Sequence, residues 1–154
     1  MFCGHPNWQS HLHRYGTESD SARCLVGMNI ERVPPDWAHP LAADGGPKPG
    51  GHKRLLRKLA DAQCTAYQVY ESVSEGTPIS PVFLSSHDLK VWLHARGHSQ
   101  AAVENFLLVG TASALFFRDG QPVDGIEALA LLSPAAAAEI GAKHRTSIRR
   151  PQDV

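Results

Sequence analysis

Hydrophobic and polar side chains alternate regularly only in the later part of the chain. Residues 65–73, TAYQVYESV, place aromatic and β-branched side chains between polar ones, a pattern that predicts a β-strand. Residues 79–83, ISPVF, predict a second strand, which Pro78 and Pro81 confine to a sheet edge because proline lacks the N–H that a ladder needs. Between them, Gly76 favours the left-handed backbone of a short loop. The two strands are therefore expected to form a β-hairpin.

Two capped helices are predicted to follow the hairpin. Ser85 and Asp88 have the spacing of a capping box, with Asp in place of the usual Glu or Gln, and predict a helix over residues 87–96. Ser99 is the cap of a second helix, expected over residues 100–109. A glycine follows each helix and favours its termination.

A second pair of strands and two further helical segments complete the periodic part of the chain. The sequences SALFFR and QPVDG flank an Asp-Gly pair, which is a strong hairpin-turn signal. Residues 126–132 predict one or two helical turns, and Pro134, preceded by the cap Ser133, begins a last helix whose end Gly141 weakens. The resulting order, β-β-α-α-β-β-α-α, predicts an α+β fold: a small antiparallel sheet with helices on one face, preceded by a largely irregular N-terminal region.

The first third of the chain lacks this periodicity. Residues 1–27 are rich in His, Ser and Gly and poor in branched aliphatic side chains, so we expect them to be disordered or to be a spurious extension ahead of Met28. Proline and glycine recur through residues 28–52, which predicts an extended linker. A short amphipathic helix is expected over residues 53–63, with its leucines turned inward and its basic side chains outward.

Charge is neutral overall but unevenly distributed. The 15 Lys and Arg residues balance 15 Asp and Glu residues, so no global field attracts the chain to nucleic acid or to a membrane. We expect the small α+β domain to span residues 53–145, with a basic tail over residues 146–154. The leading helix and the tail are basic, whereas residues 61–139 are acidic, and such blocks can attract one another within one molecule.

Cysteine content and hydropathy indicate the compartment. Three cysteines at irregular spacing argue against a disulfide framework and are typical of a reducing environment. No run approaches the roughly 18 apolar residues that a membrane helix needs, and the N-terminus lacks the basic start and the apolar core of a secretory signal. We therefore expect a cytoplasmic protein that does not contact a membrane.

The histidines invite a metal interpretation, which their spacing does not favour. His94 and His98 are four residues apart, but Gly97 ends the helix between them and the Glu of a metalloprotease motif is missing. The N-terminal residues of zinc-ligand type do not provide a closely spaced pair for each half of a structural site. They are Cys3, His5, His11, His13 and Cys24. The sequence also lacks a Gly-x-Ser-x-Gly motif and a phosphate-binding loop, so we expect neither a metal nor a cofactor.

Two features remain as candidate binding sites. Glu75, Thr77 and Ser80 lie at the hairpin loop, where a partner can reach polar side chains. An enzyme site at this loop, completed by His87, is the alternative, although enzyme activity is not the favoured interpretation. The leading helix is the second feature, because it can contact phosphate backbones as a weak nucleic-acid binder or dock on the acidic surface of the domain. Its basic side chains are Lys53, Arg54, Arg57 and Lys58.

Two segments resemble small proteins encoded by tailed bacteriophages and prophages. The sequence NIERVPPDWAHPLAADG resembles their opening, an Arg-Val-Pro-x-x-Trp-x-His-Pro segment followed by a linker. The sequence YQVYESVSEGTPISPVFLSSHDLKVWL resembles a later segment, which has Tyr-Glu, then Glu-Gly-Thr-Pro-Ile-Ser-Pro-Val, then a helix ending in Trp-Leu. The matching positions are Arg32, Val33, Pro34, Trp37, His39, Pro40, Tyr70, Glu71, residues 75–82, Leu89, Trp92 and Leu93. The chain departs from the family in the segment before Met28 and in its short, basic middle region.

That family has no established activity, so the resemblance implies no catalytic or binding residue. It implies an accessory protein of a phage or prophage. Together with the exposed hairpin loop and the asymmetric charge, it predicts a non-enzymatic module that binds another macromolecule, namely a host or phage protein.

Overall fold

The computed structural model describes residues 27–72 and 75–148. Three expectations fall partly or wholly outside this range. They are the disordered or spurious extension, the N-terminal residues of zinc-ligand type, and the basic tail beyond residue 148.

A three-stranded antiparallel sheet forms the centre of the fold, and its middle strand comes from the segment expected to be a linker. Strand β1 (Met28–Val33) pairs with β2 (Ala66–Glu71) on one side and with the short β3 (Thr111–Ala112) on the other. The linker expectation is therefore wrong for β1. The prolines begin directly after this strand, so they end β1 without interrupting it.

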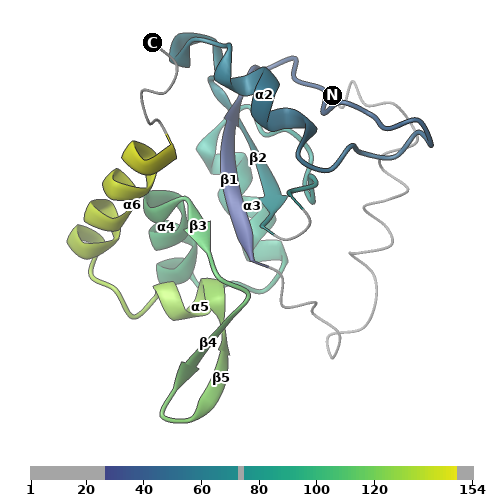
Figure 1. The fold of residues 1–154 in the computed structure, drawn as a ribbon. Helices are drawn as coiled ribbons and strands as arrows, with labels where there is room; N and C mark the ends of the chain where they lie inside the picture. Colours follow the sequence, from purple (N-terminus) through teal and green to yellow (C-terminus); the bar gives the residue numbers. More distant parts are fainter. Residues whose placement is uncertain (1–26, 73–74, 149–154) are drawn as a thin grey trace.

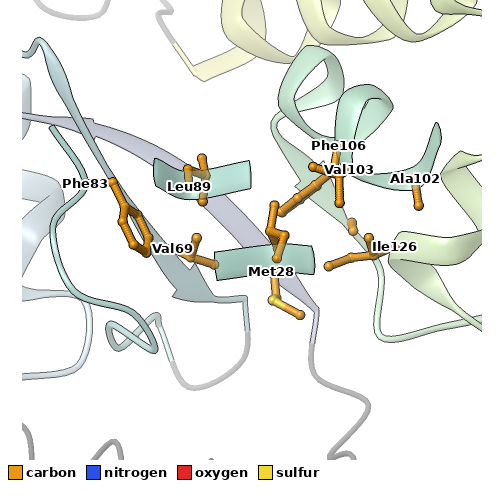
Figure 2. Packing of buried hydrophobic residues seen from close by; sticks show 10 residues of the cluster. Met28, Val69, Phe83, Leu89, Ala102, Val103, Phe106 and Ile126 are labelled. Carbon is orange, nitrogen blue, oxygen red and sulfur yellow. The ribbon is translucent and has the colours of Figure 1, made fainter. Parts of the chain in front are cut away.

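The hydrophobic core lies on one face of this sheet (Figure 2). Met28 on β1 and Val69 on β2 point into it. The alternate residues Ile30 and Tyr67 pack against the same core. Helices α3 (Ser86–Ala95) and α4 (Gln100–Val109) supply the other side of the core. Their buried contribution consists of Leu89, Leu93, Ala102, Val103 and Phe106.

The opposite face of the sheet is also covered, which the sequence did not predict. Gln68, Val69 and Tyr70 are buried in succession, and a strand buries consecutive residues only when both of its faces are packed. Helix α2 (Gly51–Arg57) and the irregular residues 34–50 provide this second cover. In Figure 1, α2 lies in front of the sheet and α3 lies behind it.

Both capped helices occur as predicted. Ser85 Oγ accepts a hydrogen bond from Asp88 N, and Ser99 Oγ accepts one from Ala102 N. Gly110 adopts the left-handed conformation that ends α4. These signals are local, so they do not depend on the rest of the fold.

The leading helix is shorter than expected and differently oriented. After α2 ends, a single 3-10 turn covers Asp61–Gln63. His52 is buried and Leu56 is half-buried, but Leu55 is 43% exposed. The side of α2 that faces the sheet is therefore centred on His52, and the leucines do not all face inward as expected.

The expected second strand of the first hairpin is also absent from the described residues. Residues 78–83 follow the edge of β2 through two isolated bridges, Tyr67 with Phe83 and Tyr70 with Pro78. Pro78 and Pro81 lack backbone N–H groups, so a continuous ladder cannot form there. Ser80 makes up part of the loss, since its Oγ accepts the hydrogen bond from Val69 N at 2.8 Å.

The last part of the chain forms a hairpin and two helices. Strands β4 (Leu115–Arg118) and β5 (Gln121–Asp124) form the predicted hairpin, which projects away from the body of the molecule (Figure 1). Helices α5 (Gly125–Leu129) and α6 (Pro134–Ile148) follow, and α6 packs on α4. The fold is α+β, as predicted, with α2 as a helix on the second face.

None of the helices in the described part of the chain has the length and apolar character needed to span a membrane.

Candidate binding site around Tyr70 and helix α2

The second face of the sheet is organised around the hydroxyl group of Tyr70, which is buried. Trp37 Nε1 donates a hydrogen bond to Tyr70 Oη at 3.1 Å, and Tyr70 Oη donates to Gln68 Oε1 at 2.9 Å. His39 Nδ1 lies 3.1 Å from the same oxygen, while its Nε2 donates to Lys48 O at 2.7 Å. One phenol thus ties residues 37–48 to the central sheet.

His52 completes this attachment from helix α2. Its ring stacks on that of Tyr70, with 4.0 Å between ring centroids and 27° between planes. His52 is 2% exposed, and its Nδ1 has no hydrogen-bond partner within the described structure. Gly76 lies against the ring, since a β-carbon at this glycine would come within 3.1 Å of His52 Cε1. We refer to Trp37, His39, His52, Gln68 and Tyr70 as the Tyr70 cluster.

Burial shifts the ionisation of several groups in and beside the Tyr70 cluster. It lowers the pKa of His52 to about 4, helped by the neighbouring charges of His39 and Lys53. It also lowers the pKa of His39 and raises the pKa of Tyr70. The pKa of the Glu31 carboxyl is raised by burial, although Lys53 opposes that shift. The cluster is therefore an uncharged attachment at neutral pH.

The three residues predicted at the hairpin loop have different environments. Glu75 is exposed and has a positive φ of 68°. Thr77 is half-buried, and its hydroxyl group donates to Glu71 Oε1. Ser80 is fully buried, and its hydroxyl group donates to Pro81 O while accepting from Val69 N. Of the three, Glu75 is the residue that a partner can reach most readily.

The basic side chains predicted as the second site are all exposed. Lys53, Arg54, Arg57 and Lys58 lie on or directly after α2, and no ion pair within residues 27–72 and 75–148 involves them. The interpretation in which they dock on the acidic surface of the domain therefore gains no support from the described contacts.

The structure brings the two predicted sites next to each other. Gly50 N donates to Gly76 O at 2.8 Å, directly before α2 begins. A β-carbon at Gly50 would lie 3.0 Å from Cβ of Glu75. The hairpin loop therefore lies directly against the start of α2, next to His52 of the Tyr70 cluster.

The other residues considered for chemistry lie apart from this region or are engaged in structure. His87 is exposed on α3. His94 Nδ1 donates to His98 O at 3.1 Å, which closes the turn between α3 and α4. Within the described ranges, no three side chains of His, Cys, Asp or Glu are placed to hold a metal ion.

Sequence reasoning missed the Tyr70 cluster, although a signal was present. Trp37, His39 and Tyr70 belong to the two segments that carry the family resemblance, and these segments meet at one hydroxyl group. Both segments had been singled out by the same resemblance. This was the available indication that side chains from the two segments lie together. Nothing comparable marked His52 or Gln68.

Comparison with known proteins adds no relative. The chain matches no protein-family model, no curated protein and no solved structure.

Proposed function

We propose that the protein is a non-enzymatic binding module, of the accessory type that tailed bacteriophages and prophages encode, which binds a host or phage protein in the cytoplasm. One observation carries the proposal. A basic helix, exposed and without ion pairs in the described structure, is fixed in position by a buried polar cluster. A helix whose backbone is already ordered binds a partner at a lower cost in conformational entropy than a flexible segment does. The ordered basic helix is therefore suited to binding.

The enzyme alternative is less well supported by the contacts. Of the residues at that site, Ser80 has a hydroxyl group that is buried and already takes part in two hydrogen bonds. A reactive serine needs an adjacent base and access to substrate. His87, which completes the site in this alternative, is exposed on α3.

The test is capture of the partner in native cells. The full-length chain, tagged at its C-terminus, is cross-linked in the cells that encode it, and the enriched proteins are quantified by mass spectrometry. We expect a reproducible protein partner that is lost when Lys53, Arg54, Arg57 and Lys58 are all changed to Gln.

A parallel capture with Arg118 and Lys143 changed to Gln is the control, because these side chains are also basic and exposed but lie on β4 and α6. Recovery of no protein above the untagged background would contradict the proposal. A phenotype abolished by Ser80→Ala or by Glu75→Gln, at unchanged melting temperature, would favour the enzyme alternative.

A further inference from the structure

The exposed side of α2 carries a continuous basic surface. At 100° per residue, the buried His52 and the half-buried Leu56 lie within 40° of each other and mark the inward side of the helix. Lys53, Arg54 and Arg57 lie 100° to 200° from His52, so they share the outward side. Lys58 follows as the C-cap and extends the basic surface by one more charge.

A large apolar side chain lies at the margin of this surface. Leu55 falls between the inward and outward sides of α2, and it is 43% exposed. Single exposed leucines are common on protein surfaces. Here, however, the leucine is adjacent in sequence to Arg54 and one turn from Lys58, so the same ligand can contact both kinds of side chain.

The start of α2 is held firmly against the rest of the fold. Gly51 approaches Pro40 so closely that a β-carbon would lie 2.8 Å from Pro40 Cγ. Gly50 is bonded to Gly76, and His52 is stacked on Tyr70. These contacts fix the backbone at the start of α2, so a partner that binds the helix does not have to order that part of the backbone.

We infer that this basic surface, formed by Lys53, Arg54, Leu55, Arg57 and Lys58, docks an acidic protein segment that carries an apolar side chain among its carboxylates; the inference rests on the proposed function and names the chemistry of its partner. The charge of Lys53 also acts on the carboxyl of Glu31, but none of the four cations forms an ion pair with the described residues, so together they favour a partner of opposite charge. The exposed leucine adds an apolar contact that a phosphate backbone does not provide.

The neighbouring carboxylate also distinguishes a protein from a nucleic acid. Glu75 lies beside Gly50 at the start of α2. A regular phosphate backbone running along the helix would meet this negative charge, whereas a peptide can place a basic or neutral side chain there. The neutral net charge of the chain likewise provides no long-range attraction to a nucleic acid.

The test measures binding of defined probes to the full-length chain by fluorescence anisotropy. The main probe is a synthetic helical peptide with Glu side chains around two Leu side chains. Comparison probes replace Leu by Ser, replace Glu by Lys, or are duplex DNA of similar length. We expect the acidic peptide with Leu to bind most tightly at physiological salt, and the Lys peptide not to bind.

Two variants and one matched control locate the site. Lys53→Gln with Arg57→Gln should weaken binding of the acidic peptide about tenfold, because two charge pairs at an exposed interface are lost. Arg118→Gln with Lys143→Gln makes the same change in net charge and should leave the affinity unaltered. Leu55→Ala should weaken binding of the Leu peptide about fivefold but leave binding of the Ser peptide and of DNA unaltered.

The inference is overturned by any of three results. They are no binding of the acidic peptide, equal losses in the two double variants, or DNA binding that is tighter than peptide binding and insensitive to Leu55→Ala. The last result would assign the surface to nucleic acid. None of the three depends on partner capture, so failure of the docking surface can be told apart from failure of the proposed function. A captured protein that still binds the Lys53→Gln, Arg57→Gln variant would likewise count against the docking surface while leaving the proposed function in place.

Discussion

At the scale of single residues, Tyr70 connects the two halves of the chain. Its hydroxyl group bonds to Trp37 and Gln68 and lies 3.1 Å from His39 Nδ1, while its ring supports His52. These residues come from three separate segments of the sequence: the loop after β1, helix α2 and strand β2. Because His52, Gln68 and Tyr70 are buried and Trp37 and His39 are half-buried, the loss of one partner leaves other polar groups unsatisfied, which makes the cluster sensitive to conservative substitutions.

Tyr70→Phe tests the hydroxyl group while keeping the ring. We expect the free energy of unfolding to fall by about 2–3 kcal/mol, because the buried Gln68 Oε1 and the Trp37 N–H lose their partner. Denaturant unfolding followed by tryptophan fluorescence gives the value. Tyr67→Phe is the matched control on the other face of β2, where the structure records no hydrogen bond to the hydroxyl group among the described residues. An equal loss in both variants would contradict the role assigned to Tyr70.

His52 predicts a pH dependence of stability. Its pKa is about 4 in the folded chain and near 6.5 when exposed, so above pH 6.5 both states are neutral and stability is unaffected. Between pH 6.5 and 4 only the unfolded state gains the proton, so stability falls as pH decreases, by roughly 3 kcal/mol in total. The lowered pKa values of His39 and His98 act in the same direction.

Glu31 acts in the opposite direction, because its raised pKa gives stability that is lost as pH rises through that value. The free energy of unfolding is therefore measured by chemical denaturation from pH 7 to pH 4 for the natural chain and for His52→Leu, and the two pH dependences are compared. The variant should show a clearly shallower decline. His87→Leu, at an exposed site, should retain the natural slope, and an unchanged slope in His52→Leu would refute the prediction.

At the scale of elements, the helix caps and the hairpin turn could be predicted from the sequence, because they depend on residues that are close together in the chain. Ser85 and Ser99 each accept a backbone hydrogen bond at the start of a helix, and the Asp-Gly pair turns the β4–β5 hairpin. The position of β1 was missed because its pairing partners lie far away in sequence, and a Pro-rich context concealed a six-residue strand. The Tyr70 cluster was missed for the same reason, since Trp37 and Tyr70 meet only after β1 and β2 have paired.

Gly141 shows how tertiary contacts reverse a propensity argument. Its weak helix propensity predicted that α6 would weaken there, yet α6 continues to Ile148. A β-carbon at Gly141 would lie 1.8 Å from Leu108 O, so the glycine allows α6 to approach α4 closely.

Gly141→Ala should therefore destabilise the protein by about 2 kcal/mol or more, although alanine is the better helix former. The matched control is Gly120→Ala at the hairpin turn, where a β-carbon would meet nothing within 4 Å and only the positive φ of 78° opposes the change. Thermal unfolding gives both values. An increase in melting temperature for Gly141→Ala would mean that α6 does not pack on α4 as described.

At the scale of the whole molecule, the central sheet separates two layers of different character. One layer is the hydrophobic core beneath α3 and α4, and the other is the polar cluster beneath α2. The basic surface on α2 keeps its position only if the second layer is as firmly folded as the first. The functional proposal therefore depends on β1 being an integral strand and not a connection.

Native-state hydrogen exchange of the full-length chain tests this claim most directly. The amide of Ile30 in β1 donates to Gly110 O at 2.8 Å, and the amide of Gly50 before α2 donates to Gly76 O at 2.8 Å. We expect Ile30 to be protected as strongly as the amides within α4, and Gly50 to be clearly protected as well. Exchange of Ile30 at the rate of an unstructured peptide, while α4 stays protected, would contradict the two-layer fold and the docking surface that it supports.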